Sequence, residues 1–372
     1  MRRGTGFLLL AFVAAACGSG TTTGTMLPPV GSTAASPTAA SPDAARYALG
    51  RFPEYPDGSL PASTIEELQG LLDAAVDQGT FVGVTAAVIL ADRGSWTGAA
   101  GSWDGIPLTL DSRHPTHSAG KTIVAAQVLR LVEDGRLGLH APVSDYLPPE
   151  LEFFAANGAT IREVLAMRSG IPDLNEEAGY YPAEQAPTAV EVFRRLPEAS
   201  VPPGSVTEYA STNYVLLGTI IEHVTGKSLS AAVRADVLAH PGLDGVVYRV
   251  ADALASDGWG VETTSASLAR WGYELYGGFA LSEASLVEMT DFQGEWYGLG
   301  VMDFSAQYGA LAVGHQGLSS VTTCCSAIIL VALPEDGVVI SVQANTVGTD
   351  PSIDTNSQVD RLGLALSDVV RR

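Results

Sequence analysis

The sequence predicts a two-lobed α/β (α+β) protein in which helices flank an antiparallel sheet and a helical lobe is inserted between the strands. Two stretches with strand composition, residues 81–91 and 95–101, come early in the folded part. Further strand composition returns only after residue 308, and mainly helical patterns lie between. Because strands must pair to bury their apolar faces, we expect a sheet assembled from distant segments.

The early elements have recognisable local signals. Residues 63–75 predict a helix with a Ser63-Thr64 cap, since apolar residues follow at helical spacing. The turn residues Asp92-Arg93-Gly94 join the first two strands into a hairpin. A long helix is expected over 118–134, and apolar residues around most of its circumference predict that it is central and buried.

The later elements define the boundaries of the two lobes. Strands are predicted over 309–314, 321–333 and 338–344, and a terminal helix over 358–370, capped by Asn356 or Ser357. We therefore place the folded domain at 61–372, with a sheet lobe over about 61–137 and 255–372 and a helical lobe over about 138–254.

Composition limits the classes of partner. The chain has 372 residues, of which 46% are hydrophobic and 16% charged, so it can bury a substantial core. Its formal net charge of −21 repels phosphate backbones, which argues against nucleic acid as a partner. The same charge repels anionic lipid, so attachment to a membrane requires an anchor rather than a basic surface.

The first 17 residues predict export. Arg2 and Arg3 precede an apolar stretch, Phe7–Ala16, that is too short to span a bilayer. The following residues up to Cys17 resemble the lipobox of bacterial lipoproteins, with Ala14 where Leu is usual. That resemblance implies a lipid on Cys17 and an outward-facing protein on the bacterial cell membrane. The alternative is cleavage after Ala16 and release of an unlipidated protein.

A tether is expected between this signal and the folded domain, over residues 18–60. Residues 18 to about 45 are almost all Gly, Thr, Ser, Ala and Pro, which bury too little apolar surface to offset the entropy of ordering. Such a spacer would let the domain stand away from the membrane.

Ser118 and Lys121 form the first candidate for chemistry. Their i, i+3 spacing at a helix N-terminus puts a hydroxyl and an amine on the same side. Only two of the 20 basic residues are lysines, Lys121 and Lys227, and lysine, unlike arginine, can become neutral and accept a proton. The alternative is a capping serine beside a surface lysine. A phosphate-binding loop is excluded, because Pro115 occupies its required first glycine.

Four segments resemble one family, the class C β-lactamase, D-alanyl-D-alanine carboxypeptidase and esterase superfamily of serine hydrolases. They are, in order, 117–122 with 145–148, 160–165 with 169–172, 203–204 with 208–218, and 314–317. The resemblance runs from about residue 62 to the C-terminus. It implies the β-lactamase/transpeptidase-like fold and a site that needs no cofactor.

The resemblance also implies roles for individual residues. Ser118 would be the acylated nucleophile, Lys121 its proton acceptor, and Tyr209 a phenol that relays a proton to the leaving group. The backbone N–H groups of Ser118 and Leu318 would form the oxyanion hole.

The implied substrate-binding positions are Ser211, His315 and Gly317, and the first of them departs from the family pattern. Ser211 stands where Asn is usual, and we expect that its shorter hydroxyl cannot supply the amide that holds the acyl carbonyl of a substrate and the lysine. Asn213 is a poor substitute because it belongs to the segment that follows. A second departure is Met167-Arg168 in place of His-Thr.

Two other groups of residues carry weaker signals. His114 and His117 have the spacing of a ligand pair, but there is no evident third ligand and Pro115 argues against a helix, so no metal site is expected. Cys324 and Cys325 are adjacent, too close for an unstrained disulfide, and we expect buried thiols.

The predicted substrate is a small ester or a peptide-like amide. β-Lactams and D-alanyl peptides present a carboxylate, but the lysine that holds it in much of the family is replaced by His315, which is mostly neutral at pH 7. We therefore favour an esterase or peptidase over a β-lactamase or D,D-carboxypeptidase. The contrasting alternative is a non-catalytic lipoprotein that binds cell-wall fragments or a partner.

Overall fold

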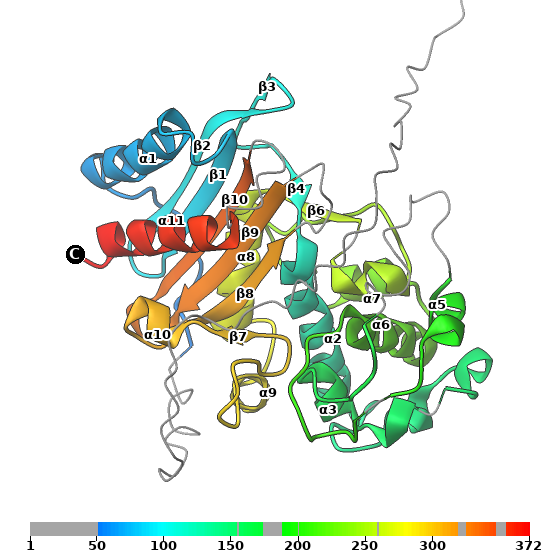
Figure 1. Cartoon of the computed structure of the whole chain (residues 1–372). Helices are drawn as coiled ribbons and strands as arrows, with labels where there is room; N and C mark the ends of the chain where they lie inside the picture. The colour runs from blue at the N-terminus through cyan, green and yellow to red at the C-terminus, as the bar shows by residue number, and fades with distance from the viewer. Residues whose placement is uncertain are drawn as a thin grey trace, which may run out of the picture. The chain divides into compact units, whose positions relative to one another are not determined.

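The described part of the chain is built around a seven-stranded sheet in the order β3-β2-β1-β10-β9-β8-β7, with every pair antiparallel (Figure 1). The computed structural model describes residues 51–372 except 155, 174–187, 200, 259, 319–324 and 347–354. The strands are β1 (Gly83–Leu90), β2 (Gly94–Trp103), β3 (Ile106–Pro107), β7 (Met302–Asp303), β8 (Val313–Leu318), β9 (Cys325–Leu333) and β10 (Val338–Thr346).

The two ends of the domain meet at the centre of the sheet. Strand β1 pairs with β10, with Gly83 opposite Asn345 and Leu90 opposite Val338. Both strands are buried along their whole length, because helices cover both faces of the sheet. The predicted assembly of the sheet from distant segments is confirmed.

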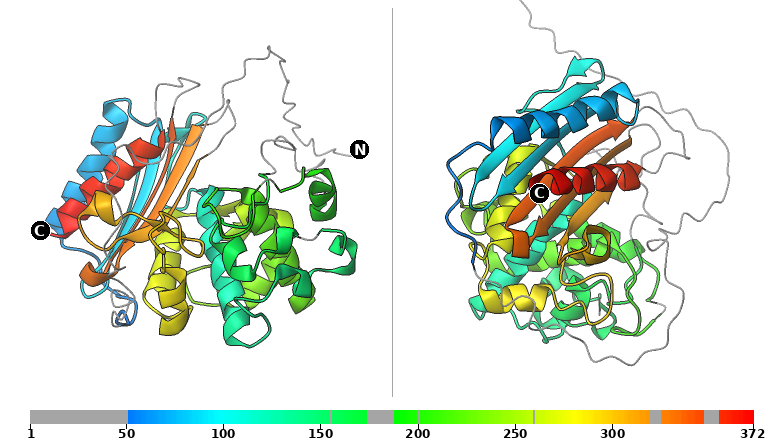
Figure 2. Two further views of the ribbon diagram at one scale, coloured as in Figure 1. Left: turned by 60° about the horizontal axis from the view of Figure 1, so that its bottom comes forward. Right: turned by 90° about the vertical axis from the view of Figure 1, so that its left-hand side faces the viewer.

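Helices α1 (Ala62–Asp77) and α11 (Thr355–Val370) pack side by side on one face of the sheet, as Figure 2 shows. Helix α8 (Ser265–Tyr276) covers the opposite face, against β1, β9 and β10. The shorter helices α9 (Glu283–Met289) and α10 (Ser305–Tyr308) lie between α8 and β8 in the sequence.

The helical lobe contains α3 (Ile161–Leu165), α5 (Ala189–Arg195), α6 (Ser211–Thr225) and α7 (Leu229–Ala235). Helix α2 (Lys121–Glu133) packs against α6 and α7. Helix α2 also contacts α8, the helix that covers one face of the sheet, because the indole N–H of Trp271 on α8 donates to Thr122 Oγ1 at 2.9 Å. The predicted central and buried helix is therefore confirmed, and it lies between the two lobes.

A small second sheet has the order β4-β6-β5. Its strands are β4 (His114–Pro115), β5 (Val247–Tyr248) and β6 (Val261–Thr263). Strand β4 leads directly into the segment that carries Ser118, so its pairing with β6 fixes where the backbone enters that segment.

Several predicted boundaries are wrong. Helix α1 begins at Ala62 after Pro61, without a side-chain cap, so Ser63 and Thr64 lie inside the helix. Helix α2 begins at Lys121 because residues 117–120 form a 3-10 turn. The strand expected from Gly309 begins at Val313, since Gly309 ends α10 with a left-handed φ of 63°. Residues 321–324 of the strand predicted over 321–333 lie outside the described residues.

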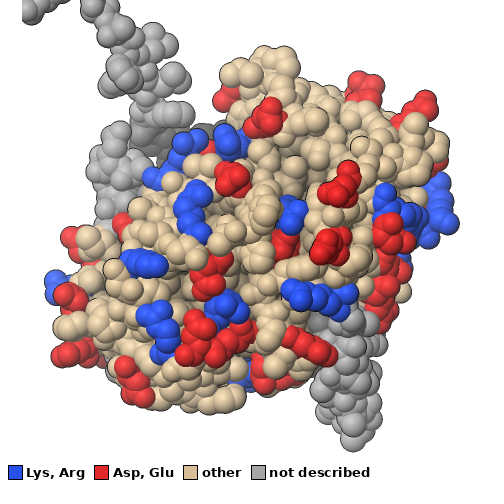
Figure 3. Space-filling model, turned by 180° about the vertical axis from the view of Figure 1, so that it is seen from behind, with Lys and Arg blue, Asp and Glu red and all other residues tan. Residues whose placement is uncertain are grey.

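Charged side chains of both signs are interspersed over the face of the protein in Figure 3. That face shows no broad basic surface of the kind that follows a nucleic-acid backbone. Among the residues that the structure describes, no helix combines the length and apolar composition needed to span a membrane. The predicted signal, lipobox and tether all fall at residues 1–60, of which only 51–60 are described.

Candidate active site

Ser118 lies on a tight turn between the small sheet and helix α2. Residues 117–120 form this 3-10 turn, which we call the Ser118 turn. Residues three apart eclipse one another in 3-10 geometry, so Ser118 and Lys121 still face the same side. The turn packs against the loop around Gly258: a Cβ at Gly120 would lie 2.9 Å from the Cα of Gly258. The backbone here has room only for glycine.

Lys121 is fully buried and points at Ser118. Its Nζ donates to Ser118 Oγ at 3.0 Å, to Ser211 Oγ at 3.3 Å and to the carbonyl oxygen of Asp257 at 3.2 Å. These acceptors match the three donors of an ammonium group. All three are uncharged, and Lys121 forms no ion pair with a carboxylate in the described part of the chain. The predicted nucleophile and base are brought together.

The lysine contact corrects one expectation about Ser211. Its hydroxyl was not expected to replace the amide that usually holds the lysine, but it accepts a hydrogen bond from Lys121. The backbone N–H of Ser211, at the start of α6, donates to Asp173 Oδ1 at 3.0 Å, which fixes the position of this residue. Asn213 turns away from the site, since its Oδ1 accepts from Ser169 and its Nδ2 donates to the Ala210 carbonyl.

Tyr209 lies beside Lys121 with a free hydroxyl. The Lys121 Nζ lies 5.1 Å from the centroid of the Tyr209 ring. The Tyr209 oxygen is buried and has no hydrogen-bond partner among the described residues. Buried hydroxyls in native structures are normally hydrogen-bonded, so an unpaired one needs an explanation. The role of Tyr209 as a proton relay stays a prediction.

Two aromatic residues that the sequence motifs did not indicate pack against the Tyr209 ring. Trp296 stacks on the Tyr209 ring at 6.3 Å between centroids, and Tyr297 meets it edge-on at 5.8 Å. Trp296 is 36% exposed, so it forms part of the rim. The only signal in the sequence was the adjacent pair of aromatics in a glycine-containing loop, which does not indicate what they contact.

His315 is fully buried beside Tyr297, and both of its ring nitrogens form hydrogen bonds within the protein. Nδ1 donates to the Gln316 carbonyl at 2.5 Å, so Nε2 of the neutral ring accepts from the Tyr297 hydroxyl at 3.1 Å. Burial, followed by the charge of Lys121, lowers the pKa of His315 to about 3. The ring is neutral at pH 7, as expected, and presents no free nitrogen to a ligand.

Strand β8 passes directly beside the Ser118 turn. A Cβ at Gly317 would lie 2.7 Å from the backbone nitrogen of Ser118 and 2.6 Å from the His117 Cβ, so only glycine permits this approach. Leu318 follows at the end of β8, paired with Ala327 and 44% exposed. The assignment of the Ser118 and Leu318 N–H groups as an oxyanion hole stays a prediction.

The remaining predicted residues take structural positions. Met167 is buried in a left-handed conformation, and the guanidinium of Arg168 donates to the Gly204 carbonyl and to Gln293. In the described part of the chain, no group of three or more His, Cys, Asp or Glu side chains is arranged to hold a metal ion. The predicted thiols lie outside what is described: Cys324 entirely, and Cys325 in its side chain.

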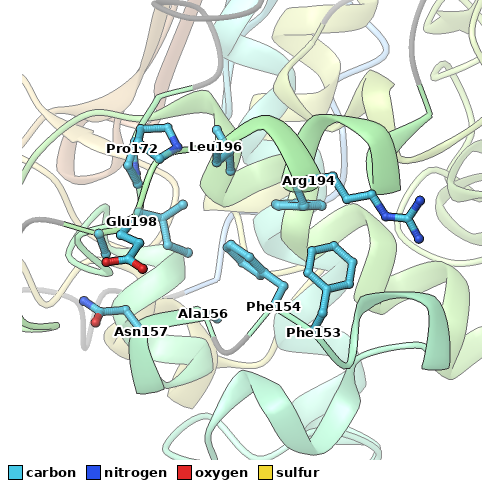
Figure 4. Close-up of a pocket in the computed structure, with 12 residues that line it drawn as sticks. Phe153, Phe154, Ala156, Asn157, Pro172, Arg194, Leu196 and Glu198 are labelled. Atoms are coloured by element: carbon cyan, nitrogen blue, oxygen red, sulfur yellow. The ribbon is translucent and has the colours of Figure 1, made fainter.

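A separate pocket of about 490 Å³ lies in the helical lobe (Figure 4). Phe153, Phe154 and Phe193 form much of its lining, and the side chain of Arg194 extends at its edge. None of the predicted catalytic or substrate-binding residues lines it.

Comparison with known proteins identifies the family. Residues 68–365 match the family model described as Beta-lactamase. The chain therefore belongs to the beta-lactamase family of serine hydrolases, and the resemblance inferred from the motifs is confirmed at that level.

Curated relatives match over shorter regions. Esterase EstB of Burkholderia gladioli is 33% identical over 205 residues, which cover 48% of this chain and 50% of that protein. Penicillin-binding protein 4 of Amycolatopsis lactamdurans is 32% identical over 138 residues, covering 35% and 34%. The chain thus spans half or less of the length of these relatives.

Solved structures support the fold. The D-amino acid amidase of Ochrobactrum anthropi SV3, in complex with L-phenylalanine, superimposes with a TM-score of 0.69 at 22% identity, over 82% of this chain and 98% of that one. The predicted β-lactamase/transpeptidase-like fold is confirmed.

Proposed function

We propose that this chain is a serine hydrolase that forms an acyl-enzyme at Ser118 and acts on uncharged esters in preference to amides. The observation that carries the proposal is the contact between the buried Lys121 amine and Ser118 Oγ at 3.0 Å. The family, with an esterase among its curated relatives, supports the same reaction class.

The reaction follows from the positions of three side chains. The neutral amine of Lys121 takes the hydroxyl proton of Ser118 while the Ser118 oxygen bonds to the ester carbonyl carbon. The Ser118 and Leu318 N–H groups hold the oxyanion of the tetrahedral intermediate. As that intermediate collapses, the bond between the carbonyl carbon and the alcohol oxygen breaks. The Tyr209 phenol donates a proton to the leaving alcohol, and Lys121 returns a proton to Tyr209. Water then attacks the acyl-enzyme by the same steps, which releases the acid and restores the Ser118 hydroxyl.

The preference for uncharged substrates rests on the state of Lys121 and His315, two basic residues that the structure describes at the site. Lys121 is occupied by its three acceptors, and His315 is neutral with both nitrogens bonded. The other lysine, Lys227, is an exposed residue after α6. A carboxylate on the substrate therefore has no positive partner among these residues, which counts against β-lactams and D-alanyl peptides.

Covalent labelling tests the proposal directly. A fluorophosphonate probe should label the purified wild-type protein at Ser118, and the Ser118→Ala variant should not react. Hydrolysis of p-nitrophenyl esters should vanish in the same variant. A wild-type protein that neither reacts nor hydrolyses any ester would instead support the ligand-binding lipoprotein.

We also propose that the protein is exported and held at the outer face of the bacterial cell membrane by a lipid on Cys17. The supporting observation is the signal-like N-terminus with its lipobox-like end, followed by the low-complexity segment. Metabolic labelling with a fatty-acid analogue, read out on the intact chain, tests this proposal.

A further inference from the structure

His117, the residue before Ser118, has a strained backbone. Its φ is +44°, a left-handed conformation that is uncommon for residues other than glycine. Such conformations persist only where the surrounding structure holds them, and they gather at functional sites. The contacts of His117 therefore deserve an explanation in terms of Ser118.

Close backbone contacts on two sides hold His117 in this conformation. A Cβ at Gly258 would lie 1.6 Å from the His117 carbonyl oxygen, so the backbone at Gly258 lies directly against the peptide that joins His117 to Ser118. On the other side, Gly317 of β8 approaches the His117 Cβ. Both neighbours are glycines, and a side chain at either position would displace the turn.

The third contact is a side-chain hydrogen bond to the sheet. Nε2 of His117 and Oγ of Ser326 are 2.6 Å apart and share a hydrogen bond. Ser326 is buried on β9, where it pairs with Asn345 of β10, so it belongs to a rigid part of the fold. Burial, followed by the charges of His114 and Lys121, lowers the pKa of His117 to about 4, so the ring is neutral at pH 7.

We infer that His117 is a positioning residue whose hydrogen bond to Ser326 anchors the Ser118 turn to the sheet and holds the Ser118 N–H beside β8. The inference rests on the proposed function, because it concerns the geometry of the oxyanion hole. A small displacement of this N–H would weaken the stabilisation of the transition state more than the binding of the ground state.

Two variants remove the anchor from opposite sides. His117→Asn retains a residue that tolerates the left-handed conformation, but its side chain is too short to reach Ser326. Ser326→Ala removes the partner and leaves the histidine. We expect each to lower kcat by roughly 10- to 100-fold, with KM changed less than about threefold, and to slow fluorophosphonate labelling by the same factor as kcat.

The double variant tests whether the two residues act through one bond. If they do, His117→Asn with Ser326→Ala should be no slower than the slower single variant. His223→Asn, on the exposed last turn of α6, is the matched control and should retain wild-type kcat. Circular dichroism and thermal unfolding establish that each protein is folded; if His117→Asn fails to fold, Ser326→Ala alone decides.

The outcomes separate this inference from the proposed function. Wild-type protein that is labelled at Ser118, with folded variants of unchanged kcat, would overturn the positioning role and leave the hydrolase proposal standing. So would a loss confined to KM, or multiplying losses in the double variant. Wild-type protein that is not labelled would overturn the proposed function itself, and this inference with it.

Discussion

Replacing Lys121 by methionine should abolish turnover without unfolding the protein. Methionine is similar in length and apolar but cannot accept a proton. Loss of a general base costs about 10²- to 10⁴-fold in rate, or about 2.7–5.5 kcal/mol of transition-state stabilisation. We therefore expect kcat/KM for p-nitrophenyl esters to fall by that factor, with Ser118 still in place.

The structure also predicts the stability of this variant. In the wild type the buried amine makes three hydrogen bonds to uncharged acceptors. Such bonds contribute about 1.5–3 kcal/mol each when one partner is charged, but burying the ammonium costs several kcal/mol. Because these terms nearly cancel, the free energy of unfolding of Lys121→Met should lie within about 2 kcal/mol of the wild-type value.

Two further variants make the comparison decisive. Lys121→Arg should also be inactive, but less stable by about 1–3 kcal/mol, because a larger side chain has to fit a fully buried position. Lys227→Met removes the exposed second lysine and should change neither property. Ester turnover and urea unfolding measure both effects. If Lys121→Met keeps turnover within about tenfold of wild type, Lys121 is not the base; if it unfolds, the lysine is structural.

Three further predictions concern pH, substrate preference and location. Burial lowers the pKa of His114 and His117 to about 4 and that of His315 to about 3, below their value of 6.5 in the unfolded chain. Below pH 6.5 the unfolded chain therefore binds more protons than the folded protein. The free energy of unfolding should be highest above that pH and fall on acidification toward pH 4, by up to about 1.4 kcal/mol per pH unit for each histidine. Equal urea midpoints at pH 7.5 and 5 would contradict this prediction. Ser211→Asn should raise the ratio of amide to ester kcat/KM, since it adds an amide donor beside Lys121, by an amount corresponding to about 1.5–3 kcal/mol; an unchanged ratio in a folded variant would show that residue 211 does not determine substrate choice. Cys17→Ser should release the protein from the membrane fraction, and retention there would refute lipid anchoring at this residue.

The parts of the fold that follow from local patterns could be predicted from the sequence. Residues 81–101 contain a hairpin signal, and the apolar helix after Ser118 has to be buried whatever surrounds it. The relation of Ser118 to Lys121 was also predictable, although the turn is 3-10 rather than α, because a spacing of three residues brings them together in both geometries.

Contacts between distant segments could not be predicted in the same way. No local pattern shows that Trp296 stacks on Tyr209, because their meeting depends on how the loop before β7 packs against the segment before α6. Similarly, the inward position of His315 is set by the register of β8 against β9. The hydroxyl of Ser211 accepts from the lysine while Asp173 holds its backbone N–H, and that second contact joins the start of α6 to a segment 38 residues earlier in the chain.

The pairing of β1 with β10 has a consequence for when the protein can become active. Strand β10 is synthesised long after β1, and Gly83 finds its partner Asn345 only then. Long-range pairing of this kind is slow, because a long loop must close before the contact forms. The anchor for the Ser118 turn lies on β9, which itself needs β10. A chain that is still being made therefore contains Ser118 and Lys121 in sequence but lacks the sheet that holds them in working geometry. The contacts around the Ser118 turn can therefore form only after β9 and β10 are in place.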